Sequence, residues 1–166
     1  LLAALAPPDS VTGQQSASGL EAGVHVTPDV VYGHKDGMAL TFDVFHPSNA
    51  HGGAVLYMVS GGWISRWSPP EWLITRSFRG LLDKGLTVVA VRHGSAPRYK
   101  VPEAEADVRR ALRYIRLHSE ELGIDENRLG VFGGSAGGHL SLMLGLASDD
   151  GVMGSDDEIL RTPARV

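Results

Sequence analysis

Residues 130–140 read Gly-Val-Phe-Gly-Gly-Ser-Ala-Gly-Gly-His-Leu and contain the pattern Gly133-x-Ser135-x-Gly137. The pattern follows a short apolar run typical of a buried strand and precedes a second apolar run, 140–147, typical of a helix. A serine at such a strand–turn–helix junction forms a nucleophile elbow, a strained turn that lifts the hydroxyl clear of both elements. Glycine fits two positions before and after the serine because it has no Cβ. We therefore predict that Ser135 is a catalytic nucleophile; the alternative is a glycine-rich turn with an incidental serine.

The partners that such a serine needs are not evident in the sequence. Chains with this motif order their triad as Ser, then Asp or Glu, then His. His139 is the only histidine after Ser135, and it lies one helical turn along, from where it does not easily accept the serine proton. We predict that His139 is a buried, hydrogen-bonded structural residue. We expect the acid and base of the triad beyond Val166, and hence that the sequence is a fragment.

Composition excludes several classes of function. The 166 residues carry a net charge of −4 and are 43% hydrophobic, which suffices for the core of one domain. The mixed charge gives no reason to expect a nucleic-acid partner, and no apolar stretch approaches the ~18 residues of a membrane span. The absence of cysteine excludes disulfides, zinc–thiolate sites and thiol catalysis. We expect no metal and no cofactor, because neither a ligand cluster nor a phosphate loop stands out. The oligomeric state is left open.

The N-terminus resembles the end of an export signal. The stretch Leu1-Leu-Ala-Ala-Leu-Ala6 matches the tail of an apolar segment with a small-residue cleavage site, and a polar stretch follows it. We expect the protein to be exported, either to the periplasm or out of the cell; the alternative is an ordinary chain end that contains leucines. Residues 1–28 are predicted to be a signal remnant and flexible lead-in, and 29–166 the start of the folded domain.

Strands and helices alternate from residue 29 onward. Strands are predicted at 30–32, 38–45, 54–59, 86–91 and 129–132, and helices at 68–84, 102–122 and 140–147. The turn residues Asp36-Gly37 make the first two strands an antiparallel hairpin. The remaining strands are continuously apolar, as parallel strands buried on both faces are. We therefore predict an α/β fold with a mostly parallel sheet and helices on both faces, truncated after the helix that follows Ser135.

The predicted helices carry distinct signals. The first begins at Ser68-Pro69-Pro70-Glu71, which reads as a capping box with proline at the first helical position. The second has an apolar stripe at helical spacing, made of Ala104, Val108, Ala111, Leu112 and Ile115. The third is apolar nearly all round, which predicts a helix buried against the sheet.

Two sets of charged residues have more than one interpretation. Arg92 ends the strand at 86–91 and either shapes a pocket or forms a buried salt bridge with Asp107. Asp149-Asp150 offers carboxylates after Ser135, but it follows the helix too closely to supply the triad acid. We predict that this pair lies in a solvated loop.

Four stretches resemble the α/β-hydrolase superfamily over roughly residues 38–147. They are Leu40–Pro47, Val59–Trp63, the segment from Arg92 through Pro102 to Asp107, and Gly133–Gly138. The similarity is to the esterase/lipase branch that includes hormone-sensitive-lipase-like and acetylxylan or feruloyl esterase-like enzymes. The resemblance implies the α/β-hydrolase fold and a serine nucleophile at Ser135.

The resemblance also implies an oxyanion hole after the strand at 54–59. The family usually has His-Gly-Gly-Gly or His-Gly-Gly-x-Trp there, whereas this chain has Ser60-Gly-Gly-Trp63. If Ser60 takes the place of the histidine, the N–H donors are those of Gly62 and Trp63; if the tryptophans align, they are those of Gly61 and Gly62. The N–H of Ala136 completes the hole in either register. The alternative is a plain Gly-Gly turn in which the tryptophan only packs.

The function that the resemblance implies is hydrolysis of small or carbohydrate-linked carboxylic esters through an acyl-serine intermediate. A serine peptidase of the prolyl-oligopeptidase type has the same fold, but such enzymes have tyrosine or tryptophan after the nucleophile and this chain has Ala136. Two further interpretations stay open: a non-catalytic binding protein of hydrolase fold, and a partial product without activity of its own.

Overall fold

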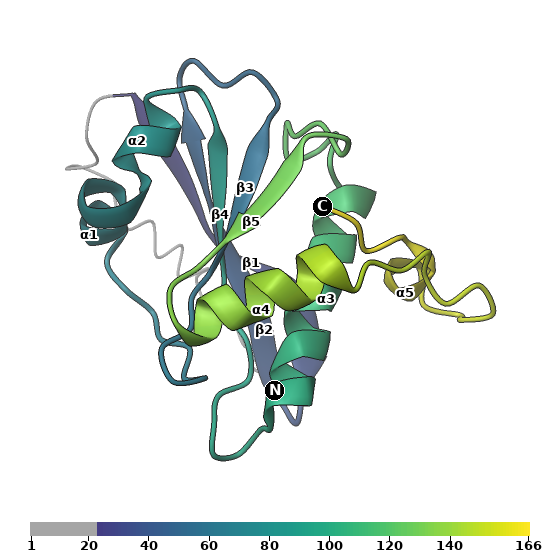
Figure 1. The fold of residues 1–166 in the computed structure, drawn as a ribbon. Coiled ribbons are helices and arrows are strands. Elements are labelled where there is room, and N and C mark those ends of the chain that lie inside the picture. The colour runs from purple at the N-terminus through teal and green to yellow at the C-terminus, as the bar shows by residue number, and fades with distance from the viewer. Residues whose placement is uncertain (1–22) are drawn as a thin grey trace, which may run out of the picture.

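The computed structural model describes residues 23–166, so the predicted signal remnant lies outside the described residues and stays a prediction (Figure 1). Five strands form one sheet in the order β1-β2-β4-β3-β5. Their bounds are β1 Val24–Lys35, β2 Met38–Pro47, β3 Ala54–Met58, β4 Thr87–Val91 and β5 Leu129–Phe132. β1 and β2 form an antiparallel hairpin, β2 runs antiparallel to β4, and β3 runs parallel to β4 and β5. The predicted hairpin and parallel strands are confirmed.

The opening hairpin is longer than the sequence predicted. β1 starts at Val24, whereas the flexible lead-in was predicted to extend to residue 28. Val24 and Val26 pack on the core, and the bulge between Thr27 and Val30 absorbs the interruption at Pro28-Asp29. The strand pattern was missed because this bulge breaks the alternation of apolar and polar residues.

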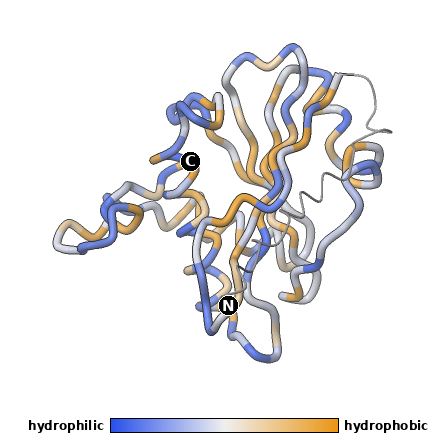
Figure 2. The backbone as a smooth tube through the Cα atoms, turned by 180° about the vertical axis from the view of Figure 1, so that it is seen from behind, coloured by the Kyte–Doolittle hydropathy of each residue, from blue (hydrophilic) through white to orange (hydrophobic). Residues whose placement is uncertain are grey.

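Helices cover both faces of the sheet (Figure 1). On one face lie α1 (Pro70–Leu73), the π-helical turn η1 (Ile74–Phe78) and α2 (Arg79–Leu82). The opposite face carries α3 (Val101–Leu117) and α4 (Ala136–Leu146). Each layer has its own apolar core: Phe45, Phe78 and Val88 belong to the first, and Val89, Leu112 and Leu140 belong to the second. Figure 2 shows the apolar residues concentrated along the central strands.

The first helix departs from its predicted start. Trp72 and Leu73 donate their N–H groups to the carbonyl of Pro69, which makes Pro69 the N-cap residue instead of Ser68. Proline has no side-chain acceptor, so the predicted capping box does not form. The segment packs its apolar side chains against the sheet, with Ile74 and Phe78 fully buried.

α3 shows the predicted apolar stripe, and every residue of that stripe is buried. The helix ends at Leu117, and the predicted end near 122 is wrong. The N–H of Leu122 bonds to the carbonyl of His118, so hydrogen-bonded turns continue up to Gly123, which has φ 63°. The turns satisfy the last helical carbonyls without extending the helix.

α4 begins directly after Ser135, four residues earlier than its apolar run. Its inner residues Leu140 and Leu144 are buried, but Leu142 is 62% exposed and Leu146 is 84% exposed. The prediction that the whole helix is buried is therefore wrong for residues 23–166, within which β5 is an edge strand of the sheet.

The segment after α4 folds back on α3. Asp149 forms ion pairs with Arg109 at 3.1 Å and with Arg113, and its backbone pairs with Ala164. The pair lies in a loop as predicted, with Asp150 exposed, but Asp149 is bound to two arginines of α3 in addition to being partly solvated. A short helix, α5 (Glu158–Arg161), follows. Within the described part of the chain, no helix combines the length and apolarity that crossing a bilayer requires.

Candidate active site

Ser135 lies in a strained turn between β5 and α4. Its backbone has φ 52° and ψ −119°, a conformation that L-residues rarely adopt and that costs about 1–3 kcal/mol. The flanking glycines make the turn feasible, because a Cβ on Gly133 would lie 2.5 Å from the carbonyl carbon of Gly137. A Cβ on Gly137 would lie 2.5 Å from the carbonyl oxygen of Met58. The turn therefore has the steric requirements that the sequence pattern predicted, and it leaves Ser135 exposed.

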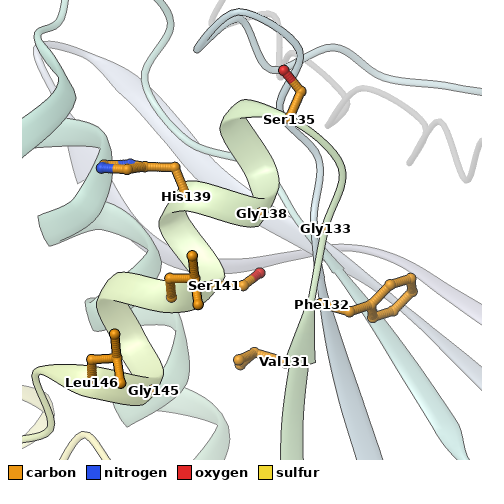
Figure 3. A pocket seen from close by; sticks show the side chains of 10 residues that line it. Val131, Phe132, Gly133, Ser135, Gly138, His139, Ser141, Gly145 and Leu146 are labelled. Atoms are coloured by element: carbon orange, nitrogen blue, oxygen red, sulfur yellow. The ribbon is translucent and has the colours of Figure 1, made fainter.

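His139 does not serve Ser135 in this structure. It lies one turn further along α4, and the two side chains leave the backbone in different directions (Figure 3). The prediction that His139 is buried and hydrogen-bonded is wrong: the residue is exposed, and its ring contacts the ring of Trp63 edge-on with 6.0 Å between centroids. The position is exposed because it faces away from the sheet, on the side of α4 opposite the buried Ser141.

The loop 60–65, which follows β3, has an unusual set of backbone hydrogen bonds. Gly61 and Ile64 exchange N–H···O bonds of 3.0 Å, which closes a tight turn. Gly62 and Trp63, at the tip of the turn, have φ 58° and 59°. Within residues 23–166, the N–H groups of Gly62 and Trp63 have no hydrogen-bond acceptor, whereas that of Gly61 is occupied.

The 60–65 loop contacts the turn at Ser135 directly. The N–H of Gly137 donates to the carbonyl of Ser60 at 3.2 Å, which fixes the loop against the first turn of α4. The N–H of Ala136 is the first of α4, and it has no acceptor among the described residues, as the first amides of a helix generally do not. The exposed hydroxyl of Ser135 thus lies beside two chain segments that offer unpaired backbone donors.

An open apolar groove of about 800 Å³ runs between β5 and α4 from the serine along the edge of the sheet. Ser135 and His139 lie towards one end of this groove, and Val131 and Leu146 lie towards the other (Figure 3). Within the part of the chain that the structure describes, no group of three or more His, Cys, Asp or Glu side chains is placed to hold a metal ion.

The segment 92–99, which follows β4, borders the 60–65 loop. The sequence left open whether Arg92 shapes a pocket or pairs with Asp107. Its guanidinium binds the carboxylates of Asp43 at 2.6 Å and Asp29 at 2.9 Å, and it does not pair with Asp107. The buried Asp107 instead binds Lys35 of β1 at 2.6 Å and accepts a hydrogen bond from the backbone of Gly94.

His93 lies in the same segment and is 5% exposed. Burial lowers the pKa of its ring below the ordinary value, against the opposing effect of a 2.8 Å hydrogen bond to the Gly94 carbonyl. The neutral ring donates from Nδ1 to this carbonyl. His93 therefore stabilises the loop, and none of the described histidines lies within hydrogen-bonding distance of the Ser135 hydroxyl.

Sequence reasoning missed Lys35, Asp43 and Ser95, each of which holds the loops around the serine. Of the three, Ser95 alone had a signal in the sequence, namely its position. It follows a buried parallel strand, at the edge of the sheet where the loops of such folds usually carry functional residues. Lys35 and Asp43 belong to the hairpin, far from Ser135 in sequence, so no local pattern links them to the site.

Comparisons with known proteins agree with this geometry. The family model described as BD-FAE matches residues 42–164. An ethyl acetate hydrolase of Pseudomonas putida is 31% identical over 138 residues, which are 78% of this chain and 43% of that protein. The crystal structure of an acetyl ester-xyloside bifunctional hydrolase from Caldicellulosiruptor lactoaceticus superposes with a TM-score of 0.65 at 26% identity, covering 89% of this chain and 56% of that one. Thermogutta terrifontis esterase 2, in a structure phosphorylated by paraoxon, gives 0.64 at 26% identity, with 85% and 54% covered. The chain thus spans about half the length of these proteins.

Proposed function

This chain belongs to the BD-FAE family, within the esterase/lipase branch of the α/β-hydrolases, and from that premise we propose that Ser135 is the nucleophile of a carboxylic-ester hydrolase. The chain is a serine esterase-like hydrolase, as its relatives are. The finer proposal concerns the acyl-serine intermediate, the donors that stabilise it and the substrates.

The observation that carries the proposal is the backbone of Ser135. A non-glycine residue at φ 52° and ψ −119° costs free energy, and such strain persists where the surrounding structure enforces it, often at functional sites. Here Gly133 and Gly137 are packed so closely that the turn has no room for side chains beside the serine. The effect is to present an exposed hydroxyl at the end of β5, in front of the helix N-terminus of α4.

The reaction follows from this placement. The Oγ of Ser135 attacks the ester carbonyl carbon while a general base takes its proton, and a tetrahedral oxyanion forms. Collapse of this intermediate expels the alcohol, which takes up a proton, and leaves the acyl group on Ser135. Attack by water then releases the acid and regenerates the serine.

We assign the oxyanion donors to the N–H groups of Gly62, Trp63 and Ala136. All three lack an acceptor among residues 23–166, whereas the Gly61 N–H is used by Ile64. This pattern supports the register in which Ser60 takes the place of the family histidine. Backbone donors held in advance stabilise charge that develops in the transition state, and the loss of one typically costs about 3 kcal/mol.

The general base and its carboxylate partner are assigned to a part of the family domain outside residues 23–166. No described histidine reaches the Ser135 hydroxyl, and the ring of His139 points elsewhere. Without a base, a serine hydroxyl is a weak nucleophile at neutral pH. The chain 1–166 alone is therefore expected to lack esterase activity.

The proposed substrates are small or carbohydrate-linked esters. The relative from Pseudomonas putida is an ethyl acetate hydrolase, and the structural neighbour from Caldicellulosiruptor lactoaceticus is an acetyl ester-xyloside bifunctional hydrolase. Both names point to short acyl groups.

Replacement of Ser135 by alanine in the full-length protein tests the proposal. Ser135→Ala should leave the fold unchanged in circular dichroism and lower kcat/KM for small aryl acetates by roughly 10⁴-fold. Turnover by the variant within about tenfold of wild type would show that Ser135 is not the nucleophile. A wild-type protein that binds aryl esters without hydrolysing them would favour a non-catalytic binding role.

A further inference from the structure

Ser95 holds the second half of the 60–65 loop through a paired hydrogen bond. Its Oγ accepts the N–H of Ser65 at 2.9 Å and donates to the carbonyl of the same residue at 3.2 Å. The next residue, Ala96, donates its N–H to the carbonyl of Trp63 at 3.0 Å. One hydroxyl thus satisfies both backbone groups of Ser65, as a neighbouring strand would.

These bonds act at the point where the loop is strained. Trp63 has φ 59°, a left-handed conformation that is unfavourable for a residue with a Cβ. Such a conformation persists only where neighbouring groups fix it. The bonds to Ile64 fix the loop from within, and those from Ser95 and Ala96 fix it from the adjacent segment. The direction of the unpaired N–H groups of Gly62 and Trp63 depends on both.

The 92–99 segment is itself well anchored. The carboxylate of Asp107 on α3 accepts the N–H of Gly94 at 2.9 Å and is neutralised by Lys35. A Cβ on Gly94 would lie 2.6 Å from the ring of Tyr99, so the segment is tightly packed on its own side. Ser95 therefore connects a rigid support to a strained loop.

We propose that Ser95 is a positioning residue that orients the oxyanion donors through Ser65 and Trp63, an inference that rests on the proposed function. Its hydroxyl is engaged on both sides by Ser65, so its contribution is to hold the loop and not to contact substrate. Loss of the hydroxyl should displace the donors while leaving substrate binding largely intact.

The test compares variants of the full-length protein on an aryl acetate and the matching aryl thionoacetate. Sulfur accepts hydrogen bonds weakly, so the rate ratio of the oxygen ester to the thiono ester reports how well the donors meet the oxyanion. Ser95→Ala is expected to lower kcat roughly tenfold with KM within about twofold, and to lower the rate ratio about fivefold.

Two matched comparisons isolate the hydroxyl. Ser95→Thr keeps the hydroxyl and should retain the wild-type kcat and rate ratio. Ser95→Val has the shape of threonine but lacks the hydroxyl, so it should behave as Ser95→Ala does. Ser119→Ala, in the turns that follow α3 and similarly half-buried, should match wild type. If Ser95→Ala does not fold, the Thr and Val pair decides.

The inference is overturned if Ser95→Ala and Ser95→Val keep the wild-type rate ratio, whether or not kcat falls, because a merely structural role would leave that ratio unchanged. The failure of the proposed function looks different. In that case Ser135→Ala would keep its turnover, whereas an inactive Ser135→Ala together with wild-type behaviour at position 95 would contradict only the role of Ser95.

Discussion

The N–H of Gly137 donates to the carbonyl oxygen of Ser60 at 3.2 Å, and this bond joins the turn that carries Ser135 to the loop that carries the proposed oxyanion donors. The approach is close because Gly137 has no side chain: its Cβ would lie 2.5 Å from the Met58 carbonyl oxygen and 3.4 Å from that of Ser60. This backbone contact therefore brings the nucleophile beside its donors, and the bonds within the 60–65 loop and from Ser95 and Ala96 set the direction of the donor N–H groups.

This contact makes Gly137 intolerant of any side chain. Gly137→Ala is expected to lower the free energy of unfolding by about 2 kcal/mol or more, because the Cβ meets backbone that cannot move independently. Gly134→Ala is the control, since a Cβ there has no neighbour within 4 Å, and it should change stability by less than about 0.5 kcal/mol. Urea unfolding of both variants makes the measurement. Equal stabilities would contradict the packing described for the turn.

The strain at Ser135 predicts a trade between activity and stability. Ser135→Gly should remove activity and raise the free energy of unfolding by about 1 kcal/mol, because glycine adopts φ 52° readily. Ser135→Ala also removes activity but keeps the Cβ, so its stability should equal that of wild type. Thermal unfolding of the two variants separates these outcomes. If the glycine variant is no more stable than the alanine variant, the turn is not strained.

The tip of the 60–65 loop should be sensitive to a side chain at position 62. Gly62 has φ 58° and open space around it, so valine would force the backbone from its left-handed conformation and turn the N–H groups away. Gly62→Val is expected to lower kcat by roughly 100-fold at a cost of about 1 kcal/mol in stability.

Gly37→Val is the matched control for this variant. Gly37 also has a positive φ, 81°, and no neighbour within 4 Å, but it lies in the β1–β2 turn. It should carry a similar cost in stability without a loss of kcat. A Gly62→Val enzyme as active as Gly37→Val would argue against donors at the loop tip.

The pH dependence of stability should report His93. Burial places its folded-state pKa below the unfolded value of about 6.5, so protonation favours the unfolded state. Its contribution is complete above that pH and is lost as the pH falls towards the folded-state pKa. The half-buried His46 changes stability in the same direction. His93→Gln should therefore reduce, without abolishing, the loss of stability between about pH 7.5 and 5.5, measured by urea unfolding. An unchanged loss would mean that His93 titrates as freely in the folded protein as in the unfolded chain.

Local patterns in the sequence predicted much of the fold. The stripe from Ala104 to Ile115 predicted α3, and the Asp36-Gly37 turn predicted the hairpin, because both signals are repeated over neighbouring residues. The pattern around Ser135 also predicted the crowding at Gly133 and Gly137, which depends on the turn alone.

Tertiary partners could not be predicted in this way. Arg92 pairs with Asp43 from the adjacent strand, and Asp107 pairs with Lys35. These partners are determined by the register of β1, β2 and β4, which no local pattern in the sequence shows. His139 was predicted to be buried because its helix is apolar, but its exposure depends on which side of α4 faces the sheet. The N–H of Gly61 is likewise occupied because the loop closes into a turn with Ile64. The two glycines allow this turn, but they do not determine that it forms.

Covalent labelling tests most directly whether Ser135 is the nucleophile. The full-length protein is treated with paraoxon, the reagent that phosphorylated the Thermogutta terrifontis neighbour, and its peptides are analysed by mass spectrometry while residual esterase activity is followed. We expect a single diethylphosphoryl adduct on the peptide that contains Ser135, formed in step with the loss of activity, and no adduct in Ser135→Ala. Inactivation with the adduct on another residue, or an active Ser135→Ala enzyme that paraoxon still inhibits, would contradict the assignment of Ser135.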